Sequence, residues 1–257
     1  MLVLLSCAKT MSAVSKVKVP LTTSPRFQKE AAEIALQMSQ FSVDELERLL
    51  RVNAKIAVEN YKRYQAFHAE ATPELPALLA YTGIVFKRLN PKDFSVEDFE
   101  YAQEHLRLTS FCYGLLRPLD VIRSYRLEGD VVLPEPGNQT MFSYWQSRLT
   151  DVFIEDIKKA GGILCNLASD EMKSLFDWKR VEKEVHVITP EFQVWKNGKL
   201  ASIVIYIKMS RGEMTRFILK NRIENPEDLK SFSWEGFEFN ESLSNEKKFV
   251  FTNGKEI

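Results

Sequence analysis

The chain begins MLVLLSCAKT (residues 1–10), and its apolar run Leu2–Leu5 leads directly into a polar segment. No basic residue precedes this run, which favours a short buried strand over a secretion signal. Two further predicted strands, Ile163–Cys165 and Leu200–Ile207, also lead into polar segments. Ligands of open α/β sheets gather beyond the carboxyl ends of the strands. The sequence therefore predicts a mixed α/β fold with its candidate site at these three strand ends.

Capping signals and periodicity predict the elements around this sheet. Helices are expected to begin at Ser24-Pro25, at the capping boxes Ser42/Glu45 and Ser95/Asp98, and near Thr140, the last ending at Gly161 or Gly162. Strands are expected at 2–5, 163–167, 185–188, 200–208, 237–239 and 249–251. No linker rich in Gly, Pro or Ser divides the chain. We expect one domain over residues 1–257, an α+β fold with a central mixed sheet surrounded by helices.

Composition narrows the class of protein. Of 257 residues 45% are hydrophobic, which excludes a wholly disordered chain. The 35 basic and 35 acidic residues balance, so a charged partner must be inferred from local clusters. Cys7, Cys112 and Cys165 lie too far apart in sequence for a metal knuckle and fit a reducing, cytoplasmic compartment. No stretch approaches the roughly 18 apolar residues that span a bilayer, so no membrane partner is expected.

The third predicted strand leads into the sharpest local signal. Leu200–Lys208 predicts a strand with one wholly apolar core face, formed by Ala201, Ile203, Ile205 and Ile207. Ser202, Tyr206 and Lys208 would lie on the other face. Ser210 and Glu213 have the spacing of a capping box, which would place Arg211 and Gly212 in the first turn of a helix. Free N–H groups there, together with the bases, favour an anion such as phosphate. An ordinary helix cap with solvated bases is the alternative.

Two stretches carry a local surplus of positive charge. Residues 206–222 have a net charge of +4, and residues 103–126 a net charge of +2. Brought together, they would form a basic groove able to bind phosphate backbones without sequence preference. Solvated or internally paired charges are the alternative. Within the second stretch, residues 106–122 suggest two helical turns around Tyr113-Gly114, a shape whose turn amides can contact DNA phosphates.

Other chemistry finds little support. His68, His105 and His186 are isolated, and no HExxH motif, P-loop or nucleophile elbow is present. We therefore expect neither a metal site nor a cofactor. Cys7, close to Lys9, is a candidate peroxide-sensing thiolate, with a buried inert thiol as the alternative.

Five stretches of the chain match one family in the family's order, and from first to last they span almost the whole chain. They are SCAKT (6–10), DFEYAQEHLRLTSFCYGLLRPLDVIRSYRLE (98–128), NLASDE (166–171), SRGEMTRFILKNRI (210–223) and WEGFEF (234–239). Through them the chain resembles the YaaA family of bacterial peroxide-stress proteins. The family usually has a proline at the position of Cys7 and a glycine at that of Phe111.

The resemblance implies a cytoplasmic protein of the oxidative-stress response that limits iron-driven damage. It also implies a helix-hairpin-helix element, here expected at Leu106–Ile122, and a basic cleft that binds DNA without sequence specificity. From their positions in the sequence, the basic residues expected to line this cleft are Arg107, Arg117, Arg123, Arg126, Lys208, Arg211 and Arg216.

The alternative is an enzyme or small-molecule binder that acts on a phosphate-bearing or nucleoside-like ligand at the strand ends. Lys9 and Arg211 would hold anionic oxygens, and Asp170 or Glu171 would serve as acid or base. The candidate ligand-binding residues are Ser6, Lys9, Asn166, Ser169, Glu171, Lys208, Arg211 and Gly212. Whether the protein turns over a substrate stays open at this point.

Overall fold

The computed structural model describes residues 1–135 and 137–256, and its central strand is β1 (Leu2–Leu5), all four residues of which are buried. β1 lies between two parallel partners, β5 (Leu106–Ser110) and β8 (Ile163–Asn166). Leu4 pairs with Arg107 on one side and with Asn166 on the other. The carboxyl ends of all three strands therefore lie at the same edge of the sheet.

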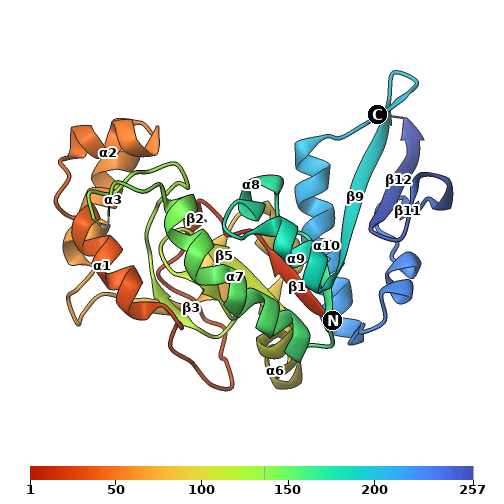
Figure 1. The fold of residues 1–257 in the computed structure, drawn as a ribbon, viewed down its shortest axis with the longest axis horizontal. Coiled ribbons are helices and arrows are strands. Elements are labelled where there is room, and N and C mark those ends of the chain that lie inside the picture. Colours follow the sequence, from red (N-terminus) through yellow and green to blue (C-terminus); the bar gives the residue numbers. More distant parts are fainter. Residues whose placement is uncertain (136, 257) are drawn as a thin grey trace.

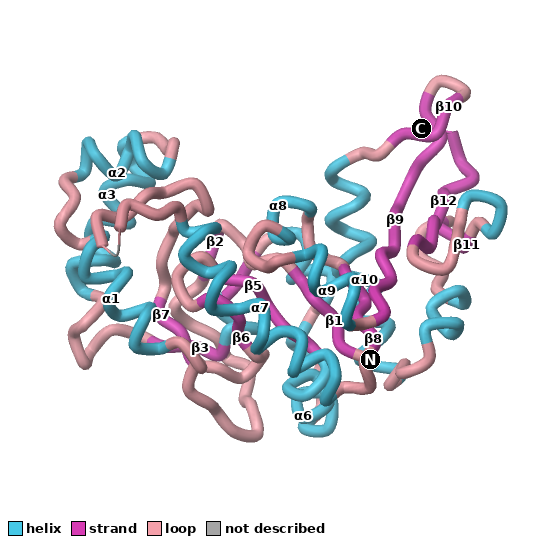
Figure 2. Tube along the Cα trace, viewed as in Figure 1, coloured by secondary structure: helices cyan, strands magenta, loops and turns pink. Residues whose placement is uncertain are grey.

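The described residues form an eight-stranded mixed sheet in the order β11-β12-β9-β8-β1-β5-β6, with β10 paired to β9 (Figures 1 and 2). The other strands of this sheet are β6 (Gly114–Leu116), β9 (His186–Lys196), β10 (Lys199–Ala201), β11 (Phe237–Phe239) and β12 (Lys248–Glu256). Two small antiparallel pairs join β2 (Thr10–Met11) to β4 (Tyr81–Thr82), and β3 (Glu74–Pro76) to β7 (Val121–Arg123). The prediction of a central mixed sheet surrounded by helices is confirmed.

Helices cover this sheet and extend it at one end. They are α1 (Gln28–Met38), α2 (Val43–Leu50), α3 (Ala54–Ala66), α4 (Ala77–Ala80), α5 (Ile84–Leu89), α6 (Val96–His105), α7 (Met141–Lys159), α8 (Asp170–Lys173), α9 (Trp178–Glu184) and α10 (Val204–Asn221). Three short 3₁₀ helices span Pro91–Asp93, Pro226–Ser231 and Glu241–Leu243. Figure 1 shows α1–α3 at one end of the molecule and β9, β12 and β11 at the other.

Two of the three predicted capping boxes are present. Ser42 caps α2 with Glu45, and Ser95 caps α6 with Asp98. Asp98 also accepts hydrogen bonds from Lys220 and Arg222 of the α10 end, at 2.6 and 2.8 Å. Burial of this carboxyl opposes ionisation, but these donors and the Ser95 amide outweigh it and lower the pKa of Asp98 to about 2.

The helix-hairpin-helix element expected at Leu106–Ile122 is wrong at that place. α6 ends at His105, and β5 and β6 follow as an antiparallel hairpin. All five residues of β5 are buried, and this strand completes the sheet beside β1. A helix–turn–helix pair exists instead in α2 and α3, where Arg51 takes a left-handed conformation at φ 50° and ends α2.

The strand expected over Leu200–Lys208 is also wrong beyond Ala201. β10 ends there, and α10 begins at Val204, so the helix starts well before the predicted cap at Ser210. Ser210 is buried in the helix interior and makes no cap. The free N–H groups of a first turn are therefore not available around Arg211, and the predicted anion site at a helix N-terminus does not exist.

Gly212 allows α10 to pack directly on α5. A Cβ at this position would lie 2.3 Å from the Val85 carbonyl oxygen and 2.8 Å from Cβ of Arg88. Backbone cannot yield as a flexible side chain does, so the two helices can hold this separation only with glycine at the crossing. The prediction that Gly212 binds a ligand is replaced by this packing role, and Gly212 does not line the cavity described below.

We predict that Gly212→Ala destabilises the fold by about 1–3 kcal/mol, the range for overpacking a close contact. The measurement is the free energy of unfolding by urea denaturation. Gly254→Ala is the matched control, because a Cβ there meets no heavy atom within 4 Å. Equal stability of the two variants would contradict the packing role.

Candidate functional site

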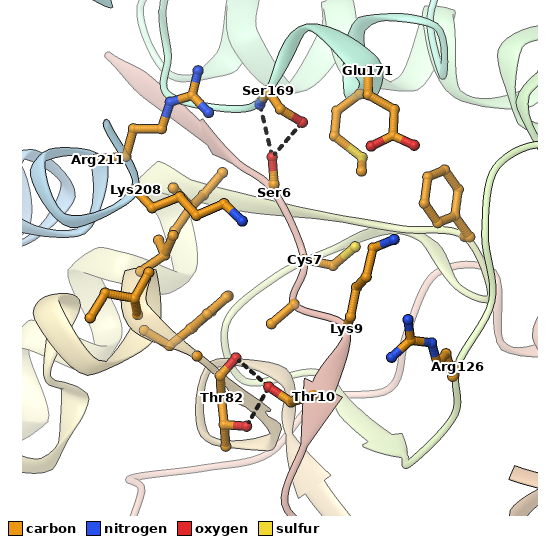
Figure 3. A pocket seen from close by; sticks show the side chains of 18 of the residues that line it. Ser6, Cys7, Lys9, Thr10, Thr82, Arg126, Ser169, Glu171, Lys208 and Arg211 are labelled. Carbon is orange, nitrogen blue, oxygen red and sulfur yellow. Dashed lines mark hydrogen bonds between the residues drawn. The ribbon is translucent and has the colours of Figure 1, made fainter. Parts of the chain in front are cut away.

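A cavity of about 330 Å³ lies at the carboxyl edge of β1 (Figure 3). The segment that follows β1 forms its floor, and the start of α5 forms one wall. Residues 125–128, the β8–α8 connection and α10 complete the lining. Six predicted side chains line this cavity. Ser6, Lys9, Ser169 and Glu171 come after β1 and β8, as the strand-end argument expects, whereas Lys208 and Arg211 lie on α10.

A hydrogen-bonded clamp joins the ends of β1 and β8. The Ser169 amide donates to Ser6 Oγ at 2.9 Å, and the two hydroxyl oxygens lie 3.3 Å apart. The Leu167 amide donates to the Leu4 carbonyl at 2.9 Å, so the two chains stay in register past the sheet edge. Asn166 is 1% exposed and accepts from the Ala168 amide, which places it beneath the site as a support, outside the cavity lining.

Two cations of α10 enter the cavity without a partner. Lys208 and Arg211 lie one helical turn apart, and neither side chain forms a hydrogen bond or ion pair with any residue the structure describes. Nε of Arg211 is fully buried without an acceptor. Burial lowers the pKa of the Arg211 guanidinium, an effect that the charge of Asp170 offsets only in part. A half-buried cation that pairs with no carboxylate of the described residues favours an anion in the cavity.

The opposite side of the cavity carries a different charge pattern. Lys9 is bound to Glu128 at 2.7 Å, and Arg126 lies 3.3 Å from the other oxygen of the same carboxylate. Glu171 lines the cavity with no ion pair among the residues described. Figure 3 shows Lys208 and Arg211 on one side and Glu171, Lys9 and Arg126 on the other. The site is therefore polarised, with unmatched positive charge facing an unmatched carboxylate.

Most residues expected to form the basic cleft are paired within the protein. Arg107 is buried and its Nε donates to Asp156 at 2.7 Å, while Nη1 donates to backbone carbonyls. The others pair as Arg117 with Asp120 (2.9 Å), Arg123 with Glu74 (2.9 Å), Arg126 with Glu128 (3.3 Å) and Arg216 with Asp93 (2.7 Å). Of the seven predicted residues, the structure brings Arg126, Lys208 and Arg211 together at the cavity.

A second hollow, here called the lysine groove, was not anticipated. It measures about 820 Å³ and is lined by residues of the segment 12–18 and of α4–α5, together with residues up to Phe94. Its exposed lysines, Lys16, Lys18, Lys87 and Lys92, form no ion pair within the described ranges, and no Asp or Glu lines it. The groove and the cavity share Thr82 and Phe86.

A sequence signal for this groove did exist. Residues 1–29 contain five basic residues and no acidic one, because the first acid of the chain is Glu30. Each lysine is unremarkable by itself, and the surplus appears only when acids are counted as well as bases.

Residues 1–135 and 137–256 contain neither a metal-binding cluster nor a membrane-spanning helix. No group of three or more His, Cys, Asp or Glu side chains is placed to hold a metal ion. No helix there is long and apolar enough to cross a membrane.

Comparison with known proteins points to the same family as the five matching sequence stretches. The family model described as "Peroxide stress protein YaaA" matches residues 1–243. The chain belongs to the YaaA family of peroxide stress proteins. This supports a role in peroxide stress.

Relatives of this YaaA-family chain carry only a general name. It is 89% identical to a UPF0246 protein of Bacteroides thetaiotaomicron, over 99% of both chains. It is 50% identical to a UPF0246 protein of Porphyromonas gingivalis and 36% identical to one of Crocosphaera subtropica, in each case over 98% of this chain and 99% of the relative.

Cys7 of this YaaA-family protein lines the cavity, yet its environment opposes a thiolate. Burial, and to a smaller extent the charges of Glu128 and Glu171, raise the pKa of the Cys7 thiol to about 12, although Thr109 opposes the shift by hydrogen bonding. Burial also raises the pKa of Cys112 and Cys165. The thiolate is the reactive form, so the geometry favours the inert alternative over a peroxide sensor.

We predict that native protein at pH 8 is alkylated by iodoacetamide at Cys7 more than about 100-fold slower than a free thiol, because little thiolate exists. Mass spectrometry of the Cys7 peptide measures the rate. The same protein unfolded in urea is the control and should react at all three cysteines. Labelling of native Cys7 at the rate of a free thiol would restore the sensor hypothesis.

Proposed function

We propose that this peroxide-stress protein binds nucleic acid without sequence specificity, through the lysine groove and the mouth of the adjoining cavity. The observation that carries the proposal is the set of four exposed lysines that share one concave surface with no carboxylate. The charge of an unpaired lysine is available to a partner, whereas the charge of a paired arginine is already balanced by a carboxylate of the protein. Neutralisation of phosphates by Lys and Arg supplies most of non-specific binding.

The groove suits a phosphate backbone better than a compact ligand. Its lysines come from the segment 12–18, from α5 and from the 3₁₀ helix Pro91–Asp93, so they border an extended surface. Tyr81, Phe86 and Phe94 lie beneath it as buried residues and give it a rigid base. Lys208 and Arg211 add positive charge in the adjoining cavity, which shares Thr82 and Phe86 with the groove. No base-reading element is part of the proposal, so the expected binding is insensitive to sequence.

The proposal also offers a route to the protection from iron-driven damage that the family resemblance implies. DNA carries a condensed layer of cations, which a bound protein releases when its lysines neutralise phosphates. Fe²⁺ held at the backbone is one such cation, and its reaction with peroxide damages the nearest DNA. Occupation of the backbone by the lysine groove would displace iron from the DNA without any iron site in the protein.

We predict that replacing Lys16, Lys18, Lys87 and Lys92 by Gln weakens duplex binding at low salt by at least roughly tenfold. The slope of log K against log salt should become shallower by up to about 4, since each phosphate contact contributes about 0.9. Fluorescence anisotropy of a labelled duplex across a salt series measures both quantities. Lys179→Gln with Lys183→Gln is the control, because these exposed lysines of α9 line neither hollow. Wild-type affinity weaker than about 100 μM at low salt would refute the proposal.

We predict further that saturating wild-type protein lowers the nicking of plasmid DNA by Fe²⁺ and peroxide, because released iron reacts away from the backbone. Gel analysis of supercoiled and nicked plasmid gives the rate. The four-lysine variant should protect much less, and the α9 control as well as wild type. Equal protection by all three proteins would show that shielding does not depend on the groove.

A further inference from the structure

The cavity beside β1 holds a charge imbalance that nucleic-acid binding in the groove does not explain. Among the arginines that line it, Arg126 is paired with Glu128, whereas the side chain of Arg211 forms no hydrogen bond or ion pair with any residue that the structure describes. Nε of Arg211 is buried and unsatisfied, and such a group costs free energy unless a ligand completes it. Lys208, one turn earlier on α10, adds a second unpaired charge.

The groups around these cations fit a phosphate. Ser6 and Ser169 present hydroxyls at the joined ends of β1 and β8. A planar guanidinium, an ammonium and hydroxyl donors are the combination that binds phosphate oxygens. Ser6 Oγ accepts from the Ser169 amide and donates its hydroxyl hydrogen to Ser169 Oγ, so the hydroxyl hydrogen of Ser169 is the one that can be directed at an anion.

The rest of the cavity fits a planar chemical group that carries N–H donors. Ile84, Phe86, Phe111, Leu127 and Met172 contribute apolar surface to the lining. On the side opposite Lys208, the Glu171 carboxylate lacks an ion pair and can accept hydrogen bonds from an amino or ring N–H group. The volume of about 330 Å³ falls in the range of small-molecule sites, roughly 300–1,000 Å³.

We propose that this cavity is a nucleotide site, which takes a nucleoside monophosphate with its phosphate at Lys208 and Arg211 and its base toward Glu171. The same chemistry is presented by a free mononucleotide and by the phosphorylated end of a strand lying in the groove. The site stands on its own observations and does not require the groove to bind DNA.

Isothermal titration calorimetry of the whole chain tests the site with AMP, GMP, CMP and TMP, with inorganic phosphate, and with the matching nucleosides. At least one nucleotide should bind more tightly than both phosphate and its nucleoside. Arg211→Met should weaken that binding by roughly 10- to 100-fold, the effect of losing a charge-assisted hydrogen bond. Glu171→Gln should change the preference among the four bases, and Lys87→Gln in the groove should leave nucleotide binding unchanged.

The folding control separates loss of binding from loss of structure. Without ligand, Arg211→Met should melt at the wild-type temperature or higher, because the change removes a buried unpaired charge. No binding of any nucleotide by the wild type at 10 mM (roughly the weak-affinity limit), or equal binding by Arg211→Met, would overturn the nucleotide site. Equal binding of phosphate and nucleotide would overturn it as well.

Two oligonucleotide arms separate the sources of the ligand. If strand ends are bound, a 5′-phosphorylated single strand should exceed its 5′-hydroxyl counterpart, and Arg211→Met should remove the difference. If free nucleotides are bound, the two strands should bind alike while nucleotide binding persists. Loss of duplex binding in the four-lysine variant with nucleotide binding intact supports both sites, so failure of the groove and failure of the cavity are distinguishable.

Discussion

The position of β1 between two parallel partners is the constraint on which the rest of the structure depends. Parallel pairing with β5 and β8 brings the carboxyl ends of three strands to one edge, although they lie up to about 160 residues apart in sequence. The Ser6–Ser169 clamp exists only because of this register. Because all four residues of β1 are buried, a slip in register would expose apolar residues and also separate the cavity walls.

A second constraint is the close crossing of α5 and α10 at Gly212, which fixes where the charged side chains of α10 lie at this edge of the sheet. α10 is the source of Lys208 and Arg211, whereas α5 lines the cavity with Val85 and the groove with Lys87. One helix pair thus lies between two binding surfaces and sets the position of both. Hydrogen bonds from Lys220 and Arg222 to Asp98 tie the far end of α10 to α6. The helix is held at its crossing with α5 and at its C-terminal end, so its cations have a defined place in the cavity.

Sequence reasoning succeeded where the signal is local and failed where a distant partner decides. Caps such as Ser42 and Ser95 are local signals, and so are the apolar runs of β1 and β8, whose polar ends supply four of the cavity residues. Arg107 looks incompatible with a buried strand until Asp156, 49 residues away, neutralises it. In Leu200–Lys208 an apolar face of period two favoured a strand, but Val204 and Ile205 remain exposed in the first turn of α10. Packing of α10 on α5 overrides the pattern that those residues suggested.

In this chain of zero net charge, the basic residues differ in whether they form ion pairs. Arginines such as Arg107 and Arg216 make short contacts with carboxylates, as suits a planar group with several donors. The lysines of the groove, and Lys208 and Arg211 of α10, form no ion pair within the described ranges. A count of bases in residues 103–126 pointed instead to arginines that are paired within the protein. A binding surface on such a protein is located by where carboxylates are missing, and no Asp or Glu lines the lysine groove.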